Sequence, residues 1–404
     1  MKLINGKIVV NNKLTSCEVL IKNGIINQIG PKIDSLDDEE VFDCKGGLIM
    51  PGAIDVHVHF REPGYEHKET IKTGSMAAAK GGFTTVLAMP NLSPVPDSYD
   101  TLMIEKNIID KDAVINVYPY IASTKGQKGV TVADIDSVKG ICYAISDDGV
   151  PVANLDLLKE VCKKALINDM VVCSHAETLG IDKTKSECEY LAVEKEIEVA
   201  KEIGCRYHFC HLSTKRAYEL INEARKEGFN NISCEVAPHH LILNKDMFLV
   251  LDTNKKMNPP LRSKDDMLAS QKALIDGTVD MVATDHAPHQ DFEKNRDFDK
   301  APNGIIGLET SLPIIYTYFV KTNLIDLNRF LDLVIYNPIK RFKLPKRDLK
   351  VGLPADICVL DILNEREYTK EEVVSKSKNA PYFGMKLYGF NMLTICNGKI
   401  VYKR

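Results

Sequence analysis

The sequence predicts an α/β fold, in which a parallel (β/α)8 barrel is joined to a small β domain built from both ends of the chain. Three observations lead to this prediction. From about residue 50 to residue 340, short apolar strands alternate with amphipathic helices. Polar residues that can do chemistry follow most of these strands. The two chain ends carry matching turn-and-strand patterns, Asn5-Gly-Lys-Ile-Val9 and Asn397-Gly-Lys-Ile-Val401.

The chain ends consist of short β segments and turns. Asn5-Gly6 and Asn23-Gly24 are strong hairpin-turn signals, and residues 352–361 read as a turn followed by a buried strand. Neither end holds enough apolar residues for a core of its own. We therefore expect residues 1–49 and 345–404 to form one composite β domain, and residues 50–344 to form the barrel. Two independent edge ribbons are the alternative.

The central region repeats a strand, a polar loop and a helix. Helices such as Tyr190–Ile203 and Lys215–Lys226 carry apolar residues at i, i+3 and i+4. An open doubly wound sheet is the alternative to a barrel, but its chemistry would gather at one switch point. Here polar residues follow nearly every strand, which favours the barrel. The predicted strands are Ala53–Phe60, Thr84–Ala88, Val114–Tyr120, Gly140–Ile145, Met170–Ser174, Tyr207–His211, Asn231–Val236 and Met281–Thr284.

Composition excludes several classes of function. The chain has 404 residues, 27% of them charged, and a net charge of −4, so nothing indicates nucleic acid or an anionic membrane as a partner. No apolar run approaches the roughly 20 residues of a membrane span, and the first residues lack the apolar core of a signal peptide. The eleven cysteines are scattered through apolar runs. We interpret them as reduced core residues and expect a cytoplasmic protein.

The stretch Asp55-Val-His57-Val-His59-Phe-Arg61 is typical of a metal site. On a strand, Asp55, His57 and His59 point to one face, and two imidazoles one step apart can share a metal ion. A single histidine of this kind is more often a hydrogen-bonded core residue. However, polar groups also end later strands, at Ser146-Asp147-Asp148-Gly149, Ser174-His175, Cys210-His211 and Thr284-Asp285-His286-Ala-Pro-His289.

In a barrel all these strand ends meet at one face. Four histidines and two aspartates converging there form a suitable nitrogen and oxygen shell for two Zn²⁺ ions. Two such cations keep a net positive centre, which lowers the pKa of bound water and polarises a carbonyl group. This pattern predicts a site that hydrolyses or forms an amide-like bond.

These residues stand in motifs that resemble the dihydroorotases, a cyclic amidohydrolase group within the amidohydrolase superfamily, over essentially the whole chain. The resemblance implies a metal-dependent (β/α)8 TIM barrel with a β-sandwich domain assembled from both termini. The motifs are Asp-x-His-x-His-x-Arg-x-Pro-Gly at 55–64, Met89-Pro90-Asn91, Ser146-Asp-Asp-Gly149, Cys210-His-Leu-Ser-Thr-Lys215, Ala237-Pro-His-His-Leu241, Asn258-Pro-Pro-Leu-Arg262, Thr284-Asp-His-Ala-Pro-His289 and Gly304-Ile-Ile-Gly-Leu-Glu-Thr310.

The resemblance also implies roles at the metals. His57 and His59 would bind the more buried zinc, and His175 and His211 the second. Asp285 would contact the first zinc and act as the general base. Many relatives bridge the metals with a carboxylated lysine, but this sequence has Asp147-Asp148 at that place. The subgroup with an aspartate bridge is the better match, with Asp148 preferred over Asp147.

Arg61 has the fork geometry to bind a substrate carboxylate in a bidentate pair, although a surface salt bridge is an alternative. By resemblance, Asn91 and His289 join Arg61 at the carboxylate, while Asn258 and the backbone at Asn303 and Gly304 read the amide edges of the ring. The polar stretch 290–304 is either a lid over the site or a solvated loop. We interpret the remaining histidines as structural: His67, His208, His239, His240 and His286.

The resemblance implies a zinc-dependent dihydroorotase, which interconverts N-carbamoyl-L-aspartate and L-dihydroorotate in pyrimidine biosynthesis. Allantoinase and dihydropyrimidinase or hydantoinase are the alternatives within the superfamily. They tend to lack an arginine at the position of Arg61 and usually carry the bridging lysine. A non-catalytic barrel that binds aspartate carbamoyltransferase is an alternative of another class. Such proteins usually lose metal ligands, and this chain keeps the whole set.

Overall fold

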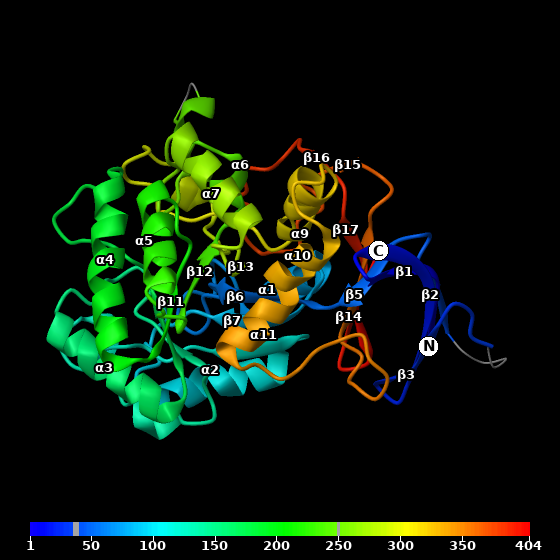
Figure 1. Cartoon of the computed structure of the whole chain (residues 1–404), viewed down its shortest axis with the longest axis horizontal. Coiled ribbons are helices and arrows are strands. Elements are labelled where there is room, and N and C mark those ends of the chain that lie inside the picture. The colour runs from blue at the N-terminus through cyan, green and yellow to red at the C-terminus, as the bar shows by residue number, and fades with distance from the viewer. Residues whose placement is uncertain (35–39, 249–250) are drawn as a thin grey trace.

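The computed structural model describes residues 1–34, 40–248 and 251–404. It is an α/β structure in which strands and helices alternate through the central region (Figure 1). Both termini lie on the same side of the molecule, beside the strands β1, β2, β14 and β17. The architecture therefore has a central helical and parallel-stranded part and a terminal sheet at one side.

The central part contains two parallel sheets, of three and five strands, whose neighbours follow the chain order. Isolated parallel bridges join these sheets at both edges, between Ile121 and Ile145 and between Val58 and His286. The eight strands therefore pair in sequence order, and the last returns to the first. They are β6 (Ala53–Val58), β7 (Phe83–Ala88), β8 (Asn116–Pro119), β9 (Ala144–Ile145), β10 (Val171–Ser174), β11 (Arg206–Phe209), β12 (Ile232–Val236) and β13 (Met281–Val282).

Helices cover the outside of these strands, and local sequence signals set their ends. Thr70 caps the first helix with its hydroxyl, and Gly82 ends it with φ at +92°, a left-handed conformation that favours glycine. The longer helices are α1 (Ile71–Gly81), α2 (Tyr99–Asp112), α3 (Leu155–Asn168), α4 (Ser186–Ile203), α5 (Lys215–Lys226) and α7 (Lys264–Asp276). The shorter ones are α6 (Pro238–Ile242), α8 (Asp291–Lys294), α9 (Ser311–Ile315), α10 (Leu327–Leu331) and α11 (Asn337–Phe342).

Each predicted central strand is present in its expected place, but several are shorter than predicted. Strand β9 begins at Ala144 rather than at the predicted Gly140. Gly140 has φ at +81°, which interrupts the extended conformation. Strand β13 ends at Val282 rather than at the predicted Thr284. The Thr284 amide donates to the Asp55 carboxylate, 3.1 Å away, instead of to a neighbouring strand. The fourth helix begins four residues before the predicted start, at Ser186.

The chain ends combine in one sheet, so the alternative of two independent ribbons is wrong. Its strand order is β18-β17-β14-β5-β1-β2-β3, with β4 beside β1. Strand β5 pairs with β14 and β1, which connects the two ends of the chain. The strands are β1 (Lys2–Val10), β2 (Lys13–Lys22), β3 (Ile25–Gly30), β4 (Val41–Asp43), β5 (Leu48–Pro51), β14 (Ile357–Asp361), β17 (Phe390–Cys396) and β18 (Lys399–Lys403), and a separate ribbon pairs β15 (Arg366–Glu367) with β16 (Lys386–Leu387).

The terminal sheet contacts the central part through helix α1. Asn391 and Thr394 both donate from their side chains to the carbonyl of Ala79, at 3.2 and 2.6 Å. A dedicated apolar core, which includes Leu3, Ile49 and Ile357, lies within the sheet itself. The sheet is thus stabilised by its own burial of apolar surface and is hydrogen-bonded to the central part.

All eleven cysteines lie within the described residues, and each is buried with a free thiol. This agrees with the interpretation of these residues as reduced core side chains. Among the residues that the model describes, no helix combines the length and the apolar character needed to cross a bilayer.

Candidate metal centre and substrate pocket

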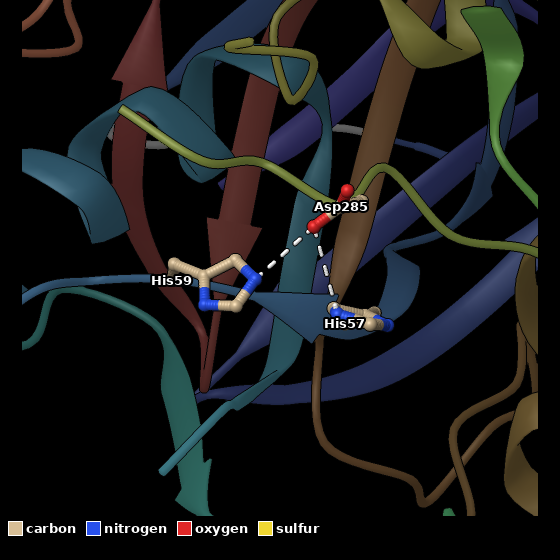
Figure 2. Close-up of side chains that lie close together, drawn as sticks. All are labelled: His57, His59 and Asp285. Carbon is tan, nitrogen blue, oxygen red and sulfur yellow. Dashed lines mark hydrogen bonds and ion pairs between the residues drawn. The ribbon is translucent and has the colours of Figure 1, made fainter. Parts of the chain in front are cut away.

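Strand β6 brings two histidines to the end of the parallel strands, where they meet an aspartate that follows β13. His59 Nε2 lies 3.1 Å from Asp285 Oδ1, and His57 Nε2 lies 3.6 Å from the same oxygen (Figure 2). All three side chains are buried. One oxygen therefore faces two imidazole nitrogens, an arrangement that a cation between them would satisfy.

A second group adjoins the first through Asp148, which follows β9. Asp148 Oδ1 lies 3.4 Å from His57 Nε2 and 3.7 Å from both His175 Nδ1 and His211 Nε2. Its other oxygen lies 3.5 Å from His59 Nε2. The structure thus places Asp148 between the two histidine pairs, the position that the sequence assigned to a bridging carboxylate.

The neighbouring Asp147 points elsewhere. Its carboxylate accepts hydrogen bonds from the backbone amides of Ser123 and Thr124, at 2.8 and 3.1 Å, and from the Thr124 hydroxyl. Asp147 therefore anchors a loop, while Asp148 faces the histidines. The sequence left the choice between these two neighbours open, because both follow the same short strand.

The donor set fits a divalent metal ion. His57 Nε2 and Asp148 Oδ1 are buried and have no hydrogen-bond partner within residues 1–34, 40–248 and 251–404, a costly state unless another group satisfies them. His175 Nδ1 and His211 Nε2 lie 3.0 Å apart and face each other. Each of these ring nitrogens can serve as a metal ligand. Imidazole and carboxylate together are the ligands that zinc prefers.

Three residues around the metal-facing cluster have an uncommon backbone conformation. Arg61, His211 and Asp285 all have positive φ, at +62°, +31° and +48°. For residues with a Cβ, the left-handed region is uncommon and costs of order 1 kcal/mol or more, and it gathers at functional sites. Each of these residues leaves the end of a strand, and the turn directs its side chain toward the shared centre.

Two buried carboxylates, Glu235 and Asp55, hold the metal-facing histidines. Glu235 on β12 lies 2.8 Å from His57 Nδ1 and 2.9 Å from His208 Nε2, and it accepts the amide of His211 at 3.1 Å. Asp55 accepts the amide of His57 at 3.0 Å. The sequence analysis missed Glu235, although a charged residue inside an apolar strand is a signal that could have identified it.

The two aspartates at the centre are held in their ionised form. Burial opposes ionisation of Asp148, but the charge of His57 keeps the pKa of this carboxyl well below its ordinary value. Burial also opposes ionisation of Asp285, and the hydrogen bond with His59 keeps its pKa low. An ionised Asp285 is able to accept a proton.

A cavity of about 230 Å³ opens directly above this centre. Arg61 borders it. In the part of the chain that the structure describes, the buried Arg61 Nε donor and the buried Asn91 Oδ1 acceptor have no hydrogen-bond partner. The other side has Gly304, where φ is +136° and a Cβ would lie 2.7 Å from the Ala287 carbonyl oxygen. The predicted residues His59, Arg61, Asn91, Asp148, His175, His211, Asn258, Asp285, Asn303 and Gly304 all line this cavity.

The two remaining predicted residues adjoin the cavity. His57 lies below it in the metal-facing cluster, fully buried. His289 Nε2 lies 3.4 Å from Arg61 Nη2 and 2.9 Å from the Asn303 carbonyl oxygen. The structure therefore brings together every site residue that the sequence predicted.

On the side of the second histidine pair, Asn258 Nδ2 lies 3.0 Å from His175 Nε2 and 3.1 Å from Glu177 Oε2. Lys183 Nζ lies 3.0 Å from the same Glu177 oxygen and also lines the cavity. A larger cavity of about 750 Å³ lies beside the first and shares Lys183, Asn258 and Asn303 with it. The sequence analysis did not single out Glu177 as a site residue or name Lys183.

The stretch 290–304, predicted as a lid or a solvated loop, is held by buried polar contacts. The buried Lys294 ammonium donates to the carbonyls of Lys256, Pro302 and Gly304, at 3.3, 3.0 and 3.0 Å. From the C-terminal segment, Asn379 Nδ2 also donates to the Gly304 carbonyl, at 3.0 Å. These contacts fix the pocket wall at residues 303–304.

Known proteins with similar sequences include dihydroorotases. A dihydro-orotase-like family model matches residues 46–185. The dihydroorotase of Geobacillus sp. (strain WCH70) is 42% identical over 405 aligned residues, which cover 96% of this chain and 95% of that protein. The dihydroorotase of Bacillus subtilis (strain 168) is 39% identical and covers 97% of this chain and 96% of its own length.

The chain belongs to the dihydroorotase family.

Solved structures of other cyclic amidohydrolases have the same fold as this dihydroorotase-family chain. The L-hydantoinase (dihydropyrimidinase) from Arthrobacter aurescens superimposes with a TM-score of 0.89 at 25% identity, covering 100% of this chain and 96% of that one. The dihydropyrimidinase from Brevibacillus agri NCHU1002 gives a TM-score of 0.88 at 24% identity, covering 100% and 95%. Shape is thus common to the wider group, whereas sequence similarity is greater with the dihydroorotases.

The different surroundings of Asp147 and Asp148 allow a matched test. We expect Asp148→Asn to lower the metal content of the purified chain, because an amide oxygen is a poorer ligand than a carboxylate. Asp147→Asn should keep its metal and lose about 1–3 kcal/mol of stability, from the weakened loop anchor. Metal analysis and thermal unfolding of both variants measure these effects. Equal metal loss in the two variants would contradict the assignment.

Proposed function

We propose that this chain is a zinc-dependent dihydroorotase, which cyclises N-carbamoyl-L-aspartate to L-dihydroorotate and hydrolyses the ring in reverse. The observation that carries the proposal is the convergence, on one small cavity, of a histidine and aspartate cluster with Arg61, whose buried Nε has no hydrogen-bond partner among the described residues. Full-length relatives about 40% identical to this chain are named dihydroorotases, which supports the same substrate.

We further propose that residues 50–344 form a (β/α)8 TIM barrel and that residues 1–49 and 345–404 form a β-sandwich domain. The sequence-ordered parallel pairing, with bridges at both sheet edges, supports the barrel. Active sites of such barrels lie at the carboxyl ends of the strands. The cluster described above follows β6, β9, β10, β11 and β13, which agrees with that rule.

Two Zn²⁺ ions are proposed as cofactors. His57, His59 and Asp285 would hold one, His175 and His211 would hold the other, and Asp148 would contact both. When bound, the ions would lower the pKa of a water molecule and polarise the reacting carbonyl group. The surrounding contacts, such as the pair between Glu235 and His57 Nδ1, orient the rings for this purpose.

The substrate carboxylate is proposed to bind at the Arg61 side of the cavity. Arg61 supplies a bidentate guanidinium, and Asn91 and His289 supply further donors. Asn258 and the backbone at Asn303 and Gly304 would then contact the amide edges of the ring. A buried carboxylate needs several donors to offset its lost hydration, and this side of the cavity provides them.

Asp285 is the proposed general base. In hydrolysis, a water oxygen attacks the ring carbonyl carbon next to the CH₂ group, and Asp285 accepts the proton of that water. The carbon–nitrogen bond then breaks, and Asp285 gives the proton to the leaving ring nitrogen. In cyclisation, Asp285 takes the proton from the ureido nitrogen as it attacks the β-carboxylate carbon; a carbon–oxygen bond then breaks, and Asp285 returns the proton to the departing oxygen, which leaves as hydroxide. The lowered pKa of Asp285 keeps the carboxylate ionised, so that an oxygen without a proton faces the cluster.

Allantoinase and hydantoinase or dihydropyrimidinase are the alternatives, and solved structures of a hydantoinase and a dihydropyrimidinase share this fold. Neutral hydantoins lack a carboxylate to pair with Arg61. We therefore expect the metal-loaded chain to turn over dihydroorotate at least about 10³-fold faster, in kcat/KM, than hydantoin or allantoin. Parallel assays of the three substrates measure this ratio. Comparable rates would contradict the proposed substrate.

A non-catalytic partner of aspartate carbamoyltransferase is the alternative of a different class, and a complex with that enzyme is also compatible with an active chain in the cytoplasm. The complete ligand set supports an active enzyme. Zinc content per purified chain, measured beside dihydroorotate turnover, separates these alternatives.

The base assignment predicts the behaviour of Asp285→Asn. This variant should keep most of its zinc, because Asp285, unlike Asp148, would contact only one of the two ions, and five other proposed ligands remain. Its kcat should fall about 10³-fold, since proton transfer by a positioned carboxylate contributes about 10²–10⁴. Steady-state kinetics and zinc analysis on the same preparation test it. Near-normal turnover would remove Asp285 from the role of base.

The carboxylate-binding assignment predicts the behaviour of Arg61→Met. The KM for N-carbamoyl-L-aspartate should rise about 10- to 100-fold, because a buried carboxylate loses a charged donor. Arg61→Lys is the matched control, because it keeps the positive charge but loses the two-pronged guanidinium. Its KM should lie between those of the native chain and Arg61→Met. An unchanged KM in Arg61→Met would contradict the assignment.

A further inference from the structure

A lysine outside the predicted site contacts Nδ1 of the His289 ring, whereas Arg61 and Asn303 lie at Nε2. Lys68 Nζ lies 3.3 Å from His289 Nδ1 and 3.0 Å from Glu293 Oε1. The Lys68 backbone is held as well, since its amide donates to the Tyr65 carbonyl at 2.9 Å and its carbonyl accepts the Ser377 hydroxyl at 2.6 Å. The ammonium is therefore fixed against one nitrogen of a pocket histidine.

The two ring nitrogens of His289 face groups of opposite character. An ammonium only donates hydrogen bonds, so Nδ1 must accept and cannot carry the proton. On the other side, Nε2 lies 2.9 Å from the Asn303 carbonyl oxygen, which only accepts, and 3.4 Å from Arg61 Nη2, which only donates; the shorter contact favours a proton on Nε2. Lys68 at Nδ1 and Asn303 at Nε2, the nearest neighbour of each nitrogen, therefore favour the same tautomer.

The ring is also neutral. Burial lowers the pKa of His289 to about 2, and the nearby charges of Arg61, Lys68 and Lys294 act in the same direction. A neutral imidazole has one N–H group, and which nitrogen carries it is set by its partners. A protonated ring with two N–H groups would place one of them against the Lys68 ammonium.

We propose that Lys68 is a positioning residue that fixes the tautomer of His289, so that its single N–H lies on Nε2, beside Arg61 and Asn303 in the pocket wall. This inference rests on the proposed binding of a substrate carboxylate there. A carboxylate accepts hydrogen bonds and does not donate them. In the Nε2–H tautomer, the proton that faces the Asn303 carbonyl can be shared with a carboxylate bound beside Arg61, whereas the other tautomer would present a lone pair to the anion.

Glu293 completes the arrangement. Its carboxylate holds Lys68 Nζ, and its second oxygen accepts the amide of Gln290 at 3.0 Å. Glu293 Oε2 lies 3.8 Å from His289 Nδ1, beyond hydrogen-bond distance, so it acts on the ring only through Lys68. Lys68 thereby links the loop after β6 with the stretch that follows β13.

The test uses the metal-loaded full chain labelled with ¹⁵N-histidine, without substrate. The His289 signals are identified by their loss in His289→Gln, and their ¹⁵N shifts report which ring nitrogen carries the proton. We expect the Nε2–H pattern in the native chain and a mixture of tautomers in Lys68→Met. Lys68→Arg should keep the native pattern. Lys72→Met, at an exposed lysine on the adjacent helix, is the control.

Kinetics supply the second readout. In Lys68→Met the KM for N-carbamoyl-L-aspartate should rise about tenfold, the effect of one charge-assisted hydrogen bond, with kcat within about twofold. Damage to folding would instead lower the active fraction and leave KM unchanged. Lys72→Met should keep both constants.

The native Nε2–H pattern persisting in Lys68→Met, or an unchanged KM, would overturn the proposal. If Lys68→Met does not fold, Glu293→Gln tests the same link, with a smaller shift in the same direction expected. The tautomer is measured without substrate. A chain that fails to cyclise N-carbamoyl-L-aspartate would therefore overturn the proposed function while the ¹⁵N shifts still decide the role of Lys68.

Discussion

The site depends on one buried carboxylate, that of Glu235. It lies between His57 and His208, and it also accepts the backbone amide of His211. The charges of His57 and His208 keep its pKa well below the ordinary value against the effect of burial. Because Glu235 engages Nδ1 of His57, the Nε2 atom remains directed at the cluster. One side chain on β12 thus orients donors from β6 and from the end of β11.

Around that contact, the strand ends carry strain that the rest of the structure must offset. Arg61, His211 and Asp285 are held at positive φ, and such residues cost of order 1–3 kcal/mol each. Parallel strands with buried faces provide the surrounding contacts that keep them in place. For example, the amide of His59 donates to the His286 carbonyl at 2.8 Å, which joins the first and last strands beside Asp285.

Much of this arrangement could be predicted from the sequence, because strands have a period of two and barrels gather their strand ends. These two rules were enough to bring His57, His175 and Asp285 together from positions far apart in the chain. Strand lengths were less predictable. Thr284 has the apolar surroundings of a strand residue, yet its amide bonds to a side chain, and only the fold shows this.

The residues that sequence reasoning missed act across loops. Lys68 and Asn379 are ordinary polar residues in their own segments, and nothing in their local pattern distinguishes them from solvated side chains. Their roles arise from which loops pack together. Glu235 is different, because a glutamate in the apolar strand Ile232–Val236 needs a buried partner. The sequence alone could therefore have indicated that Glu235 has a structural or functional role.

The C-terminal segment gives the terminal sheet a direct connection with the pocket. Asn379 is buried and contacts three backbone groups there: its amide nitrogen donates to the carbonyls of Ala287 and Gly304, and its oxygen accepts the amide of His289. Gly304 has no space for a Cβ beside Ala287, so these two segments are fixed at close range. The wall of the pocket therefore combines the loop that carries Arg61 with residues 287–289, residues 303–304 and Asn379. Because one of them follows β14 of the terminal sheet, the pairing of the two chain ends also fixes the shape of the pocket.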